Sequence, residues 1–471
     1  MSMQPRVPLM PRFEYKHYLL GLLTLVAAFN FLDRGVLSLV MEPIKQEFQL
    51  SDSQLGFMGG FAFALFYAVA GIPIARWADR GNRNHVISLT TMLWSIMLVI
   101  SGLVSNFVQL LLVRVGVAVG ESGCTPPAQS LIAEYFSRAE RPRAMAIYWM
   151  SLPLSTILAY LVGGWLVEQF GWRITVMIIG IPGVLLAVLV KFTLREPRLN
   201  TIKNSERLIT PAGQSKPEQE SLLSVLKALW EKSAFRHLST GFCVSYFFGG
   251  GISLWIPAFF MRSYGMEAGE LGTWLAFTWG LGGLCFTYLG GYLATRYLPS
   301  KERLQMKIVS MLVVLCSVFH ILCYLSSNKY TALMFLSLVM GVAIPLLQAP
   351  VYSAIQSLVE EKRRAVALAF IFMFANLIGL GLGPVVVGII SDALVPDFGE
   401  ESLRYALLLF SPGYLWCAYH NWKASTTIEE EIIAVEKGTQ EVVATSAEHE
   451  GGFADGSYNE FSITKSRAEN L

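Results

Sequence analysis

The chain has 471 residues, of which 54% are hydrophobic and 15% are charged, and its mean hydropathy is +0.50. This composition excludes a water-soluble globular protein of the same length and indicates an integral membrane protein. The net charge of +2 does not indicate a nucleic-acid partner, because the basic residues lie in the loops between apolar stretches.

Twelve stretches with few or no charged residues follow one another along the chain. Most have the roughly 20 residues that a helix needs to cross the hydrocarbon core of a bilayer. The last is short and is interrupted by Pro412 and Gly413. We therefore expect an all-α membrane protein with twelve transmembrane helices. The stretches are 18–40, 55–75, 86–104, 107–133, 144–167, 174–190, 237–261, 271–295, 308–325, 331–359, 365–390 and 405–422.

Lys and Arg residues concentrate in every second loop, beginning with residues 76–85 and including the long loop 191–236. By the positive-inside rule, this pattern predicts that both termini and the long central loop are cytoplasmic. The opposite loops contain only Lys45, Arg173, Arg262, Lys329 and Arg404.

A polar segment rich in Pro, Ser, Gln and Lys divides the twelve stretches into two groups of six. It reads as a linker, and its end at 221–230 is amphipathic enough for a short surface helix. After residue 422 the chain is polar, and we expect a disordered tail with helical character near 428–435. The predicted parts are a cytoplasmic N-terminal segment (1–17), a first six-helix bundle (18–194), a cytoplasmic linker (195–235), a second six-helix bundle (236–422) and a cytoplasmic tail (423–471).

An internal repeat supports this division. Gln54-Leu55-Gly56 with Phe61 is echoed in the second half by Glu270-Leu271-Gly272 with Phe277. Arg143-Ala144-Met145-Ala146 is echoed at a similar offset by Arg364-Ala365-Val366-Ala367. Many secondary transporters are built from repeated halves around a site near the membrane midplane.

Four charged residues lie within apolar stretches: Asp33 and Arg34 in the first, and Arg114 and Glu121 in the fourth. A charge at bilayer depth costs about 2.5–3.5 kcal/mol on insertion scales and marks a candidate functional site. Arg114 and Glu121 are two helical turns apart and share one face. Asp33 could pair with Arg114 or with Arg34, and Glu121 with the base that is left.

These carboxylates are the candidate proton carriers, Glu121 first and Asp33 second. Burial disfavours the charged form of a carboxylate, whereas a neighbouring guanidinium favours it. A cavity that alternately fills with water and empties shifts that balance, so a proton can be bound on one side and released on the other. The alternative is a permanent salt-bridge network that stabilises the first bundle, although buried ion pairs stabilise poorly compared with apolar packing.

The segment after the second stretch resembles the signature of the major facilitator superfamily. An acid at this helix end can face a neighbouring helix N-terminus and basic residues, which would hold an inner gate shut. The candidate residues of this cytoplasmic gate are Asp79, Arg80, Arg83, Arg138 and Arg143. The resembling segment reads Gly71-Ile72-Pro73-Ile74-Ala75-Arg76-Trp77-Ala78-Asp79-Arg80-Gly81-Asn82-Arg83.

Within that superfamily the first half resembles the Spinster-like family. Ala118 and residues 155–160 depart from the family's glycine-rich pattern, which bears on substrate specificity. The resemblance implies that helices 1 and 4 line a central cavity and that the cargo is a sphingoid or lysophospholipid-type amphiphile. The residues that carry it are Asn30-Phe31-Leu32-Asp33-Arg34, Arg114, Gly120-Glu121-Ser122, Pro126-Pro127, Pro153 and Gly171-Trp172-Arg173.

The apolar stretches of the second half carry no Asp or Glu at mid-depth. A cavity with one charged wall and one mostly apolar wall suits an amphiphile whose head meets Arg34 or Arg114. We interpret His320 as a packing residue. The candidate cavity residues are Asn30, Ser245, Tyr246, Trp255, Gln348, Tyr352, Gln356, Phe374 and Asn376.

These patterns together favour a proton-coupled secondary transporter of an amphiphilic lipid that works by alternating access. One alternative is a proton-coupled transporter of small organic anions or drugs, and another is a non-transporting membrane sensor or lipid-binding scaffold. The sequence has no nucleotide-binding glycine loop, no metal-ligand spacing and no catalytic arrangement, so we expect no enzyme activity, no cofactor and no metal. We expect a monomer in a bacterial plasma membrane, with the bilayer, the substrate and protons as its partners.

Overall fold

The computed structural model describes residues 12–197, 222–360 and 363–451, and in these residues every regular element is a helix. The elements of the first half are α1 (Arg12–Phe48), α2 (Asp52–Gly56), η1 (Phe57–Ala62), α3 (Phe63–Arg80), α4 (Arg83–Ser101), α5 (Phe107–Glu121), α6 (Thr125–Tyr135), α7 (Arg141–Trp149) and α8 (Ser151–Thr193).

The second half follows the same plan. The segments η1, η2, η3 and η5 are π-helical turns within longer helices, and η6 is a short 3-10 turn. The elements are α10 (Leu222–Glu231), α11 (Ser233–Tyr264), α12 (Ala268–Leu275), η2 (Ala276–Leu281), α13 (Gly282–Tyr297), α14 (Glu302–Leu325), α15 (Lys329–Ser337), η3 (Leu338–Ala343), α16 (Ile344–Ser357), α17 (Arg364–Phe374), η5 (Ala375–Leu382), α18 (Gly383–Phe398), η6 (Gly399–Glu401), α19 (Ser402–Phe410) and α20 (Gly413–Gly451).

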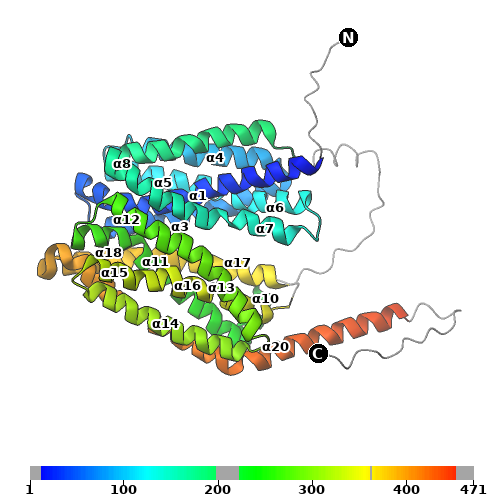
Figure 1. Cartoon of the computed structure of the whole chain (residues 1–471). Helices are drawn as coiled ribbons and strands as arrows, with labels where there is room; N and C mark the ends of the chain where they lie inside the picture. Colours follow the sequence, from blue (N-terminus) through cyan, green and yellow to red (C-terminus); the bar gives the residue numbers. More distant parts are fainter. Residues whose placement is uncertain (1–11, 198–221, 361–362, 452–471) are drawn as a thin grey trace, which may run out of the picture.

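The helices form two bundles that pack against each other (Figure 1). In the first bundle α1 and α4 both pack on the long helix α8, and in the second α11 and α14 both pack on α20. The start of α1, the linker helix α10 and the end of α20 all lie at one end of the molecule (Figure 1). We call this the inner end, and we call the opposite end, where α2 and α12 begin, the outer end.

The twelve predicted stretches lie in helices or in runs of helices. Among the described residues, nine helical runs are long and apolar enough to cross a membrane, and two of these, Arg141–Thr193 and Val366–Lys437, each contain two predicted stretches. α8 is kinked between its two stretches at Gly171, whose φ of 73° and ψ of 169° are not helical. This positive φ favours glycine. The predicted stretch 271–295 lies in α12, η2 and α13.

The tail differs from the prediction of disorder, because α20 continues as a helix to Gly451. Ile428 and Ile432 are buried in the second bundle. The carboxylate of Glu431 accepts hydrogen bonds of 2.9 and 3.1 Å from the Ala234 amide in the first turn of α11. An apolar pair four residues apart and a carboxylate at a helix N-terminus therefore attach this segment to α11. The rest of the predicted tail, residues 452–471, lies outside the described residues.

Candidate functional site

The four intramembrane charges form two ion pairs between α1 and α5. Nη1 of Arg114 donates a hydrogen bond of 2.7 Å to Oδ2 of Asp33. Nε and Nη2 of Arg34 donate bonds of 3.1 and 3.0 Å to Oε2 of Glu121. The sequence left this pairing open, and the structure pairs each acid with a base of the other helix.

Only one member of this cluster has substantial access to open space. Asp33, Arg114 and Glu121 are 2%, 3% and 0% exposed, whereas the Arg34 side chain is 33% exposed. A molecule entering the site would therefore meet the Arg34 guanidinium first, and it would reach Glu121 only through Arg34. Of the two arginines predicted to bind a substrate head group, the geometry favours Arg34.

Three aromatic rings surround the Arg34 guanidinium. Its central carbon lies 5.5, 5.0 and 5.2 Å from the ring centres of Phe31, Phe63 and Tyr67. Such cation–π contacts hold a guanidinium in place without neutralising it. Sequence reasoning missed Phe63 and Tyr67, although their spacing of four residues puts both on one face of α3.

Three polar atoms of the cluster are buried without a hydrogen-bond partner among the described residues. They are Oε1 of Glu121, Nε of Arg114 and Nδ2 of Asn30, which was predicted to line the cavity. An unpaired buried polar atom costs about 1–3 kcal/mol. A proton or a polar ligand group bound at Glu121 would relieve part of that cost, so the cluster can still accept a partner on the Glu121 side.

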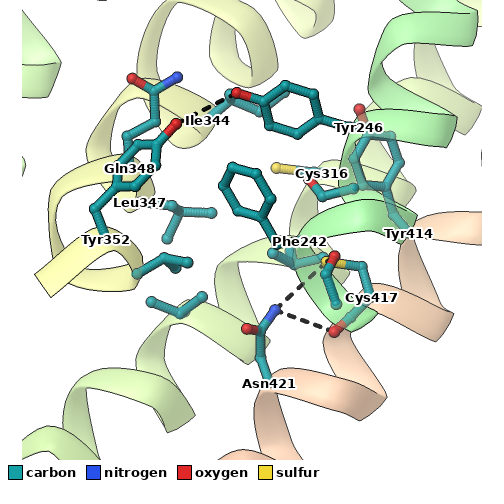
Figure 2. Close-up of a pocket in the computed structure, with 15 residues that line it drawn as sticks. Phe242, Tyr246, Cys316, Ile344, Leu347, Gln348, Tyr352, Tyr414, Cys417 and Asn421 are labelled. Carbon is teal, nitrogen blue, oxygen red and sulfur yellow. Dashed lines mark hydrogen bonds between the residues drawn. The ribbon is translucent and has the colours of Figure 1, made fainter. Parts of the chain in front are cut away.

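The second bundle contains a pocket between α11, α14, α16 and α20 (Figure 2). It offers about 100 Å³ to water-sized groups, and four predicted cavity residues line it: Ser245, Tyr246, Gln348 and Tyr352. The hydroxyls of Tyr246 and Tyr352 lie 3.3 Å apart in its lining (Figure 2). Most of the other lining residues are apolar, such as Val309, Val313 and Leu347.

The remaining predicted cavity residues of the second bundle lie elsewhere. Trp255 is fully buried, and its indole N–H donates a bond of 3.0 Å to the Pro384 carbonyl, so it packs α11 against α18. The amide of Asn376 donates to the Phe372 carbonyl at 2.7 Å. Phe374 is half-buried and Gln356 is exposed, and neither lines the pocket. Trp255 therefore does not face the pocket in this structure. In a sequence, an aromatic residue that packs between helices cannot be distinguished from one that faces a cavity.

The predicted cytoplasmic gate residues divide into two groups at the inner end. Asp79, Arg80, Arg138 and Arg143 are exposed there. Arg83 is buried, and its guanidinium contacts the carboxylates of Glu196 and Glu134 and the hydroxyl of Ser130. All three partners belong to the first half, so Arg83 ties that half together and does not bridge the two halves. Sequence reasoning missed Glu196, which lies just after a span in a loop without a recognisable motif.

The outer end is closed by a second charged cluster, which does bridge the halves. Arg262 of α11 donates to Glu42 of α1 at 2.6 Å and to both oxygens of Asp52 of α2 at 2.8 Å. Lys45 and the Ser391 hydroxyl each donate to Asp52 at 2.6 Å. The five polar side chains satisfy one another across the interface, so they join the two halves at the outer end.

The charges of this outer cluster depend on one another because the cluster is buried. Asp52 is inaccessible to solvent, and removal of one partner of a buried ion pair leaves an uncompensated charge that costs about 3–5 kcal/mol. Sequence reasoning had assigned Lys45 and Arg262 only to outer loops. Both acids and bases lie at these outer helix ends, but nothing in the sequence shows which of them meet.

Comparisons with known proteins agree with this architecture. Residues 23–384 match the family described as the Major Facilitator Superfamily. The chain is 34% identical to a protein of Mycolicibacterium smegmatis named MFS-type efflux pump, over 88% of this chain and 93% of the relative. It is 23% identical to a Danio rerio protein named sphingosine-1-phosphate transporter SPNS2, over 83% of this chain and 80% of the relative.

A solved structure extends the comparison to three dimensions. The crystal structure of a bacterial homologue of the human lysosomal transporter Spinster, in an inward-facing and unoccupied conformation, has a TM-score of 0.77. Its sequence is 29% identical, and the match covers 88% of this chain and 98% of that one.

Proposed function

Because the chain belongs to the Major Facilitator Superfamily and is a transporter of the Spinster type, we propose that it moves an amphiphilic lipid by proton-coupled alternating access. The observation that carries this proposal is the pair formed by Arg34 and Glu121. One member is accessible and caged by aromatic rings, and the other is buried with one oxygen unpaired among the described residues.

Protonation of Glu121 would neutralise the carboxylate that holds Arg34. The guanidinium would then lack an anion while still being held by its aromatic cage. An anionic head group could take the place of the carboxylate, and departure of the proton would restore the original pair. Proton binding at Glu121 and anion binding at Arg34 therefore favour each other, and this mutual effect is the coupling.

Two separate features of the structure support an amphiphilic cargo. Arg34 offers the first bundle's charge, and the pocket of the second bundle offers apolar side chains together with a tyrosine pair. A lysophospholipid or a sphingoid phosphate has a charged head, which suits Arg34, and one long apolar tail, part of which suits an apolar pocket. The name of the Danio rerio relative, sphingosine-1-phosphate transporter SPNS2, supports the same class.

The test uses purified protein in liposomes with an imposed pH gradient. A lysophospholipid and a short dicarboxylate are offered separately, and flux is followed with labelled molecules. Glu121→Gln and Asp33→Asn should insert in the membrane and lose pH-driven flux, because neither can exchange a proton. Glu231→Gln, which changes an exposed carboxylate of α10 at the inner end, should retain it. Full transport by both intramembrane variants under a pH gradient would refute the coupling scheme.

A second candidate cargo has support of its own. The Mycolicibacterium smegmatis relative is named an efflux pump, which favours export of a drug or another small organic molecule through the same pathway. Flux of such a molecule without flux of lysophospholipid would favour this candidate. Absence of any flux would favour a sensor or lipid-binding scaffold.

The location and the inner gate complete the proposal. We assign the transporter to the plasma membrane of a bacterium as a monomer, with both termini in the cytoplasm. The exposed residues Asp79, Arg80, Arg138 and Arg143 would close the inner end when the outer end opens. Asn376, Phe374 and Gln356 would border the pathway outside the pocket.

A further inference from the structure

Two carboxylates cross between the halves at the outer end and bind backbone amides of the opposite half. The carboxylate of Asp392, on α18, accepts hydrogen bonds of 2.8 Å from the amides of Asp52 and Ser53, at the start of α2. The carboxylate of Glu168, on α8, accepts a bond of 2.9 Å from the amide of Gly269, at the start of α12. Each acid therefore caps a helix that belongs to the other bundle.

The two caps occupy equivalent positions in the internal repeat. The amides of Ser53 and Gly269 donate these hydrogen bonds. The sequence separation between Ser53 and Gly269 equals the offset of the repeat between Gln54-Leu55-Gly56 and Glu270-Leu271-Gly272. The capping acids Glu168 and Asp392 are separated by a similar length of chain. The caps are thus reciprocal: the first half caps the second and the second half caps the first.

Close backbone contacts beside the caps show the same reciprocity. Gly388 and Gly164 each lie four residues before a capping acid. A Cβ on Gly388 would lie 2.4 Å from the backbone oxygen of Asp52, and a Cβ on Gly164 would lie 2.5 Å from that of Ala268. The helices that are capped carry equivalent glycines. A Cβ on Gly56 would lie 2.4 Å from the backbone oxygen of Pro384, and a Cβ on Gly272 would lie 2.1 Å from that of Tyr160. Small residues let membrane helices approach this closely.

These contacts require a closed outer end. α2 continues through η1 and α3 as one helical run, Asp52–Arg80, so the amides that Asp392 caps begin a long helix of the first bundle. Separation of the bundles at the outer end would pull both carboxylates away from their amides and admit water between the glycines. The attraction between a carboxylate and a helix N-terminus falls off within about one helical turn, so this separation would abolish it.

We propose that Asp392 and Glu168 are a pair of reciprocal latches, each of which holds the outer end shut by capping a helix of the opposite bundle. The inference rests on the alternating access proposed above and goes beyond it by assigning two residues outside the substrate and proton sites. The latches differ in strength. Asp392 is half-buried and binds two amides, whereas Glu168 is exposed and binds one.

The test measures conformation and needs no transport. Spin labels are placed at Leu103 and Ser327, exposed positions at the outer ends of the two bundles, in a background without the native cysteines. Distances between the labels in lipid nanodiscs give the ratio of outer-open to outer-closed molecules. Asp392→Asn should raise this ratio by roughly two- to fivefold, the range expected for one charge at a helix N-terminus.

Further variants compare the strengths of the two latches and provide the control. Glu168→Gln should raise the ratio less than Asp392→Asn, and the double variant should show the product of the two effects, because separate sites act independently. Asp392→Ala, which also removes the acceptor atoms, should exceed Asp392→Asn. The matched control is Glu270→Gln, since Glu270 lies in the same first turn of α12 but pairs with Lys329 of its own bundle at 2.7 Å.

Two results would overturn the proposal. One is a wild-type ratio in both latch variants, and the other is a shift in Glu270→Gln as large as that in Glu168→Gln. Failure of the proposed transport function would look different, because flux would be absent while the distance ratio still responded to Asp392. Size-exclusion profiles of each variant establish that the measured populations come from folded protein.

Discussion

Variants of the ion pair between Asp33 and Arg114 test whether the intramembrane charges stabilise the fold or serve transport. Both residues are buried, and Nη1 of Arg114 lies 2.7 Å from Oδ2 of Asp33. Asp33→Leu leaves the Arg114 charge buried without its anion, and Arg114→Met leaves the Asp33 charge without its cation. Each single change should cost about 3–5 kcal/mol of unfolding free energy.

The double variant gives the decisive comparison. Replacement of a buried pair by apolar residues of similar volume is often neutral or stabilising, so Asp33→Leu with Arg114→Met should regain most of the loss. A domain of 150–250 residues loses roughly 2–4 °C in Tm per kcal/mol. The single variants should therefore melt roughly 6–20 °C below the wild type, and the double variant close to it.

Thermal unfolding in detergent, followed by intrinsic fluorescence, measures these shifts, and lysolipid flux in liposomes is measured on the same samples. The expected double variant is stable and inactive. The reasoning is wrong if the double variant is as unstable as the two single changes added together, or if it transports like the wild type. A pair near the surface, Glu360 with Arg363 at 3.3 Å, is the control, and its removal should leave Tm unchanged because such pairs contribute little.

Two further changes test packing and the pocket. Gly290→Ala places a Cβ 2.2 Å from the Leu346 carbonyl oxygen, and this overpacking should lower the free energy of unfolding by about 1–3 kcal/mol. Gly21→Ala has nothing within 4 Å of its Cβ, so it should leave the free energy of unfolding unchanged or raise it by up to about 1 kcal/mol. Thermal melting of both variants tests this difference. Tyr352→Phe removes the hydroxyl that lies 3.3 Å from that of Tyr246. It should weaken lysolipid binding by roughly two- to tenfold, the contribution of one hydrogen bond, and leave Tm unchanged. An affinity equal to that of the wild type in a fluorescence titration would show that the tyrosine pair is not part of the binding site.

The four charged residues within the membrane-spanning segments could be identified from the sequence as a candidate site. Asp33, Arg34, Arg114 and Glu121 stood out because a charge at bilayer depth is expensive wherever the helix points. Their pairing did not follow, because it depends on the rotation and relative height of α1 and α5. A shift of one residue on either helix would turn a partner away by about 100°.

Contacts between the halves were beyond the sequence for a related reason. Arg262 and Asp52 lie in different halves of the chain and meet at 2.8 Å, yet each reads as an ordinary charge at an outer helix end. Their meeting is decided by how two completed bundles pack. The same holds for Asp392, whose partners are backbone amides and leave no trace in side-chain chemistry.

The helical tail was half visible. Ile428 and Ile432 have the spacing of an apolar helix face, but the surrounding Glu residues resemble a solvated segment. What decides the outcome is the surface offered by α11, including the Ala234 amide that binds Glu431. A short amphipathic segment becomes a stable helix when tertiary packing covers its apolar face.

The π-helical turns η1 and η2 have a mechanical consequence. They follow α2 and α12 in the two halves and contain the repeated residues Phe61 and Phe277. A turn with the wider hydrogen-bond pattern interrupts the regular ladder and bends more readily than the helix on either side. The short outer pieces can therefore tilt about these turns, so that parting the halves at the outer end needs less motion than rotation of a whole half of the molecule.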